Sequence, residues 1–152
     1  MLSKRAAFLK PSPTLALAAK AKELKNQGHD VFSLTVGEPD WDTFELIKKA
    51  GIEAIQGGQT KYAPAEGIPE LRKAICQQTV LDLGVHYDPA QVTVSAGAKF
   101  IIYCALQVLI DPGDEVIIPA PYWVSYPTMV ELAGGIPVIA YCGTEQGYKL
   151  TP

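Results

Sequence analysis

The sequence predicts an α/β fold in which a parallel sheet is wrapped by helices. Helical and strand-like segments alternate along the chain, and from about residue 91 the order is strand, helix, strand, helix, strand with short connections. In such sheets the connections are right-handed and ligands bind at the carboxyl ends of the strands. The 152 residues are 48% hydrophobic and 19% charged, which is typical of a folded domain and not of a disordered chain.

Proline, glycine and capping residues mark the elements of the first half. A Ser-Pro pair predicts the start of a helix over residues 12–27, which a glycine stops. The sequence VFSLTV at 31–36 is expected to form a short buried strand that ends at the turn 37–40. Thr43 is expected to cap a second helix running to about residue 56.

In the second half of the chain, prolines and glycines mark the boundaries of the elements more regularly. A proline opens the next helix, a glycine precedes the strongly apolar one after it, and a Gly-Gly pair closes the last. Helices are expected over residues 69–84, 98–110 and 125–133, and strands over residues 91–95, 115–119 and 136–141.

Composition excludes several classes of function. The net charge of −3 argues against a nucleic-acid partner, and no apolar run approaches the roughly 18 residues of a membrane helix. The basic N-terminal stretch is interrupted by prolines, so an ordinary first helix is expected there and not a signal peptide. Cys76, Cys104 and Cys142 form no CxxC pair, which favours reduced core thiols in a cytoplasmic protein.

The junction at Gly97 is a candidate phosphate site. A strand is expected to end there and a helix to begin, and the free N–H groups and dipole of a helix N-terminus suit a phosphate. Glycine removes the Cβ that would block close approach. Many such junctions bind nothing, and the P-loop and GxGxxG fingerprints of nucleotide sites are absent from the sequence.

Three further segments are candidates for binding. Tyr122, Trp123 and Tyr126 follow an expected strand, so they could stack on a flat ligand ring or serve as core aromatics over the sheet end. Gly37 follows another strand and could approach a substrate carboxylate, or could belong to a plain turn. Tyr62 lies in a polar loop from which its phenol could reach a phosphate. The two histidines have no neighbouring ligand residue, so no metal site is expected.

Taken in order, the motifs resemble the amino-terminal part of the fold-type I, pyridoxal-phosphate-dependent aminotransferases. The match is nearest to the bacterial-type aspartate aminotransferases of class I. The segments that carry it are KPSPTLALAAKAKEL (10–24), LTVGEPDWDT (34–43), KYAPAEGIPELRKAI (61–75), VTVSAGAK (92–99) and LIDPGDEVIIPAPYWVSYPTMVELAGG (109–135). One departure is Phe44, which stands where the family often has a proline.

This resemblance implies roles for individual residues. Gly97, Ala98 and Lys99 match the turn whose N–H groups hold the phosphate of pyridoxal 5′-phosphate, and Trp123 matches the aromatic residue that stacks on its pyridine ring. Tyr62 matches the tyrosine that reaches the cofactor phosphate of the neighbouring subunit in a homodimer. Trp123 also borders the substrate, together with the glycine at position 37, which matches the glycine near the substrate carboxylate.

The resemblance also implies an organisation and a reaction. It implies a three-layer fold with helices on both faces of the sheet, of which residues 1–45 are the N-terminal segment and linker and 46–152 an incomplete first part of the large cofactor domain. The reaction moves an amino group from an amino acid such as aspartate to a 2-oxo acid such as 2-oxoglutarate. The lysine that forms the Schiff base is expected beyond Pro152, so no catalytic residue is assigned here, and the isolated chain is expected to be inactive. A non-catalytic binding or regulatory protein with the same fold is the alternative.

Overall fold

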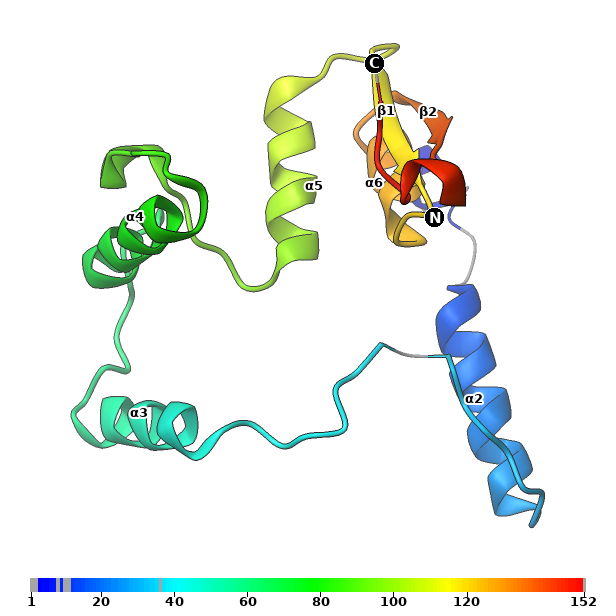
Figure 1. Cartoon of the computed structure of the whole chain (residues 1–152), viewed down its shortest axis with the longest axis horizontal. Coiled ribbons are helices and arrows are strands. Elements are labelled where there is room, and N and C mark those ends of the chain that lie inside the picture. Colours follow the sequence, from blue (N-terminus) through cyan, green and yellow to red (C-terminus); the bar gives the residue numbers. More distant parts are fainter. Residues whose placement is uncertain (1–2, 8, 10–11, 36, 152) are drawn as a thin grey trace. The chain divides into compact units, whose positions relative to one another are not determined.

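The computed structural model describes residues 3–7, 9, 12–35 and 37–151. The chain divides into two compact units, the first ending at Lys61 and the second beginning at Tyr62. Figure 1 shows the course of the chain and labels its longer elements. The predicted domain boundary between residues 45 and 46 stays a prediction.

Within its described residues, the first unit contains the helices α1 (Lys4–Ala7), α2 (Pro13–Asn26) and α3 (Glu45–Gln56). The predicted start of α2 is confirmed, because the Ser12 hydroxyl accepts a hydrogen bond from the Leu15 amide at 3.5 Å and Pro13 occupies the first helical position. An N-cap oxygen satisfies one of the amides that a helix start leaves without a partner, and proline has no amide to satisfy.

The prediction that Thr43 caps α3 is wrong. The residue at the N-cap is Phe44, which has no side-chain oxygen and makes no capping hydrogen bond. The Thr43 amide instead donates to the Asp42 carboxylate at 2.9 Å. Thr43 lies outside the helix, which begins at Glu45.

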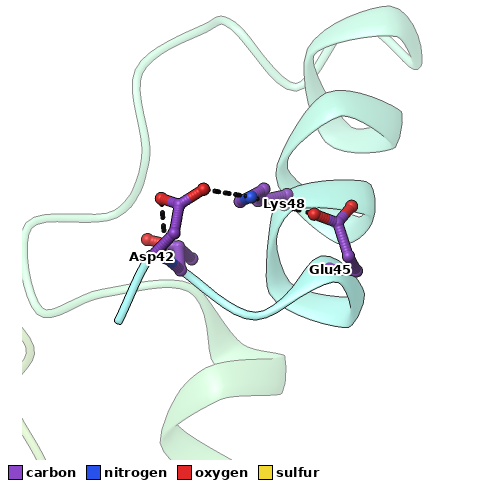
Figure 2. Close-up of polar contacts among 4 residues, drawn as sticks. Asp42, Glu45 and Lys48 are labelled. Carbon is purple, nitrogen blue, oxygen red and sulfur yellow. Dashed lines mark hydrogen bonds and ion pairs between the residues drawn. The ribbon is translucent and has the colours of Figure 1, made fainter. Parts of the chain in front are cut away.

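A small charged cluster lies at the start of α3. Lys48, one turn into α3, donates to Asp42 and also to Glu45, at 2.9 Å (Figure 2). The hydrogen bond from Lys48 holds the pKa of Asp42 below its usual value, and the two carboxylates raise the pKa of Lys48. Because both carboxylates are exposed, the cluster orders the turn before α3 but adds only weakly to stability.

The buried strand predicted at residues 31–36 is also absent from the part of it that the structure describes. Residues 31–35 form neither helix nor strand, and the side chains of Phe32 and Leu34 are 90% and 97% exposed. A strand is held by hydrogen bonds to a neighbouring strand, and none of the described segments pairs with this one. The apolar run predicted a buried strand, but in the described residues it has no strand partner and is not buried.

The second unit follows the predicted helices closely. It contains α4 (Pro69–Leu83), the short 3-10 helix η1 (Pro89–Gln91), α5 (Ala98–Leu109), β1 (Glu115–Ala120), α6 (Ser125–Leu132), β2 (Ile136–Tyr141) and the 3-10 helix η2 (Thr144–Gln146). The predicted glycine stop of α4 is confirmed, since Gly84 adopts the left-handed conformation at φ 69°.

The strand predicted at 91–95 is wrong for a related reason. Gln91 ends η1, and residues 92–95 pair with no strand among the described residues, although the backbone of Val92 is extended. The Val94 amide donates instead to the carbonyl of Glu66 at 2.9 Å. Arg72 ties the same region together, since its guanidinium donates to Glu66 and to the carbonyl of Pro89 at 3.2 and 2.9 Å. The segment is therefore held by a hydrogen bond to the loop residue Glu66 rather than by pairing with a strand.

The two predicted strands from residue 115 onward are confirmed, and they pair in parallel. Their register runs from Glu115 opposite Ile136 to Ala120 opposite Tyr141. Helix α6 connects the strands and contacts both of them, as parallel pairing requires (Figure 1). The predicted α/β character of this half is therefore present in a strand–helix–strand unit.

The described core is small and centred on this unit. Its buried apolar side chains are Cys76, Ile118, Met129, Val130 and Cys142. All three cysteines are free thiols, two of them buried and Cys104 half-buried, which agrees with the expectation of reduced core thiols. Within the described residues, no helix combines the length and apolar character needed to cross a membrane.

Replacing Gly67 with alanine is expected to destabilise the second unit. Gly67 has φ +105°, and an added Cβ would lie 2.7 Å from the Cβ of Val94. The close contact should lower the free energy of unfolding by about 1–3 kcal/mol beyond the cost of the backbone conformation. Gly84→Ala is the matched control, because its φ is also positive but nothing lies within 4 Å. Urea denaturation followed by circular dichroism measures both, and equal losses would contradict the expectation.

The charged cluster at α3 leads to two expectations: the pKa of Asp42 is lowered, and the stability that its carboxylate contributes depends on pH. Because the folded-state pKa of Asp42 is lowered, its stabilising effect is present above the ordinary value of 3.8 and is lost as the pH falls through the lowered value. Lys48→Met should raise the Asp42 pKa, read from the carboxyl carbon shift by NMR. Lys49→Met is the control, since Lys49 pairs with Glu53. An Asp42 pKa that both variants shift equally would rule out the specific contact.

Candidate cofactor site

At the amino-terminal end of α5, backbone amides are left without hydrogen-bond acceptors. Gly97 is the N-cap residue, at φ 90° and ψ 147°, and makes no side-chain cap. Among the described residues, the amides of Ala98, Lys99 and Phe100 have no hydrogen-bond acceptor, and the first turn contains no acidic residue. Free amides and the positive end of the helix dipole therefore face the space in front of Gly97 without compensation.

The space at Gly97 is suited to a phosphate. A Cβ built on this glycine would meet nothing within 4 Å, and its positive φ is one that glycine adopts without strain. An anion can therefore approach the amides closely, with hydrogen bonds and the helix dipole both favouring it. The residues present fit the phosphate group that the sequence resemblance implied.

The segment after β1 presents exposed aromatic side chains. Tyr122 and Trp123 follow the carboxyl end of β1 directly, and they are 39% and 45% exposed. Both side chains are therefore only partly buried in the described unit, and their binding role stays a prediction. With Tyr126, they line an open hollow of about 510 Å³, whose other walls are Ile118, Pro119 and Pro121.

The structure brings two of the predicted site residues together. The Lys99 ammonium lies over the indole ring of Trp123, 5.7 Å from its centroid. Lys99 comes from the first turn of α5 and Trp123 from the segment after β1, so the anion-suited helix end and the aromatic segment adjoin. A cation at this distance over an aromatic face is attracted by the ring. The sequence gives no local signal of this contact, because the two residues belong to different elements.

A second hollow continues from Lys99 along α5. It measures about 370 Å³ and is lined by Ala96, Lys99, Phe100, Tyr103, Met129 and Leu132. The sequence pattern did not single out Phe100 or Tyr103. Tyr103 stands four residues after Lys99 on α5, and residues at this spacing share a helix face, so the spacing could have identified it.

The remaining predicted residues lie apart from this pair. Tyr62 is fully exposed in the loop between α3 and α4, and no hydrogen bond or ring contact joins it to Lys99 or Trp123 in the described structure. Gly37 belongs to the first unit and has open space around it. Their binding roles stay predictions. Among the described residues, no group of three or more His, Cys, Asp or Glu side chains could hold a metal ion.

Comparison with known proteins identifies the family. The family described as "Aminotransferase class I and II" matches residues 29–152. An aspartate/prephenate aminotransferase of Cereibacter sphaeroides is 56% identical over 99% of this chain and 38% of its own length. An aspartate aminotransferase of Geobacillus stearothermophilus is 52% identical with the same coverage. The chain thus spans about two fifths of the length of these relatives.

Solved structures agree with the sequence relatives. The aspartate aminotransferase from Thermus thermophilus, solved with maleate, superposes with a TM-score of 0.91 at 46% identity, over 99% of this chain and 40% of that one. The aspartate aminotransferase from Rhizobium meliloti gives a TM-score of 0.90 at 41% identity, over 99% and 38%. The α/β fold class predicted from the sequence is thereby confirmed, and the chain belongs to the class I and II aminotransferases.

Proposed function

We propose that this chain supplies the phosphate-holding and ring-stacking part of a pyridoxal-phosphate-dependent aminotransferase. The observation that carries the proposal is the family match over residues 29–152, which includes the open amino-terminal end of α5 and Trp123. The reaction would move an amino group from an amino acid such as aspartate to a 2-oxo acid such as 2-oxoglutarate. The relatives named as aspartate and aspartate/prephenate aminotransferases support this choice of donor.

The cofactor would be held by backbone and aromatic groups. The amides of Ala98 and Lys99 would donate to the phosphate, Gly97 would leave room for it, and Trp123 would stack on the flat pyridine ring. When bound, pyridoxal phosphate supplies an electron sink for the charge that develops at the substrate Cα. The residues of this chain bind and orient the cofactor, and none of them is assigned to proton transfer.

Substrate and subunit contacts form the finer part of the proposal. Gly37 would lie near the substrate carboxylate, where its lack of a side chain leaves the open space seen around it. Tyr62 would donate to the cofactor phosphate of a neighbouring subunit in a homodimer. Its complete exposure and lack of a partner in the described chain support this arrangement. A cytoplasmic location and a role in amino acid biosynthesis belong to the same proposal.

A non-catalytic protein that keeps the phosphate turn is the second candidate. Both candidates bind the cofactor, so binding alone does not distinguish them. The 52–56% identity to proteins named as aminotransferases favours the enzyme.

The chain is expected to bind pyridoxine 5′-phosphate, which has the ring and the phosphate but no aldehyde to react with lysines. Trp123→Leu should weaken this binding by about 2- to 12-fold, since an aromatic stack contributes about 0.5–1.5 kcal/mol. Equilibrium dialysis measures the affinity, with inorganic phosphate as competitor.

Trp41→Leu is the matched control, because Trp41 is an exposed tryptophan of the first unit. Binding that Trp41→Leu weakens as much as Trp123→Leu, or that phosphate leaves unchanged, would argue against the proposed site.

The isolated 152-residue chain is expected to show no transamination with aspartate and 2-oxoglutarate, even with pyridoxal phosphate added. None of its lysines matches the family position that anchors the cofactor, and that amine is also the base that moves the substrate proton. A coupled assay of oxaloacetate formation measures the rate. Clear turnover by this chain would show that one of its own lysines performs the role.

A further inference from the structure

We propose that Lys99 is a positioning residue whose ammonium holds the indole ring of Trp123 beside the amino-terminal end of α5, ready to stack on a flat ligand. The ligand-binding half of this proposal rests on the proposed function. The contact itself does not, because it joins two side chains of this chain.

The place of Lys99 in the helix is the first argument. Lys99 is the second residue of α5, where a cation faces the positive end of the helix dipole, and no acidic residue in that turn compensates for it. Its charge therefore does not stabilise the helix. Among the described residues, no salt bridge involves Lys99, and the recorded interaction of its ammonium is with the ring of Trp123.

The surroundings of Trp123 are the second argument. The side chain is 45% exposed and borders an open hollow, so packing encloses it on only part of its surface. No described residue accepts a hydrogen bond from its indole N–H. The backbone is fixed, since the Trp123 carbonyl accepts from the Tyr126 amide at 3.0 Å. The ring orientation then depends on the contact with Lys99 more than it would in a buried tryptophan.

Lys99 belongs to both halves of the candidate site, the amino-terminal end of α5 and the aromatic segment at Trp123. Lys99 contributes its amide to the group of free donors and its side chain to the contact with the ring. One residue thereby couples the position of an anion at α5 to the position of the aromatic surface. A ligand with a phosphate and a flat ring would meet both already oriented, which lowers the entropy lost on binding.

The contact can be tested without any ligand. In the Trp41→Phe background Trp123 is the remaining tryptophan, since the sequence has two. The near-ultraviolet circular dichroism of its indole should fall by more than half in Lys99→Met and in Lys99→Gln. Lys99→Arg should retain the signal, because a guanidinium also attracts an aromatic face. Lys73→Met, which removes a lysine from α4, should also retain it.

The results separate this proposal from the proposed function. An indole signal that survives in both Lys99→Met and Lys99→Gln, or that Lys99→Arg or Lys73→Met also abolishes, would overturn the contact. In the same proteins, Lys99→Met should bind pyridoxine 5′-phosphate about two- to fivefold more weakly and Lys99→Arg normally. Unchanged affinity in Lys99→Met would overturn the positioning role. No binding by the parent chain would overturn the proposed function and the ligand-facing role, while the indole signal still decides the contact.

Discussion

The parallel pairing of β1 with β2 is the constraint on which the second unit depends. Parallel strands run in the same direction, so the chain must cross back between them, and α6 makes this crossing while covering the sheet. The turn back into β2 is tight. The Gly113 amide donates to the carbonyl of Gly134, and a Cβ on Gly135 would lie 2.7 Å from Ile110. The buried side chains Ile118, Met129 and Val130 follow from this arrangement.

The same pairing determines where chemistry can occur. The carboxyl end of β1 releases the chain into the aromatic segment at Tyr122 and Trp123, and Lys99 of α5 reaches that segment. Two incomplete features are thereby joined, namely a helix end with free donors and an exposed ring. Each alone is common in α/β proteins and binds nothing in many of them. Their adjacency, together with the family match over residues 29–152, makes a phosphate-bearing aromatic cofactor the best-supported ligand.

The elements that the sequence predicted well are those with local causes. Helices α2, α4, α5 and α6 lie within one or two residues of their predicted bounds, because a cap, a proline or a left-handed glycine acts on its own neighbours. At α3 the local pattern was misleading, since the N-cap residue is Phe44 and not Thr43. The strands at 31–36 and 91–95 fail for a different reason. A strand needs hydrogen bonds from a distant segment, which no local pattern supplies.

The α/β class, the strand–helix–strand order, the glycine at the start of α5 and the family could be read from the sequence, because they depend on periodicity, on turn residues and on motifs in fixed order. The folded chain was needed to show which strands are paired, which aromatic residues are exposed and that Lys99 lies over the ring of Trp123. The difference comes from the range of the interactions. Caps and turns are settled within about four residues, whereas strand pairing and cation–ring contacts join residues that only folding brings together.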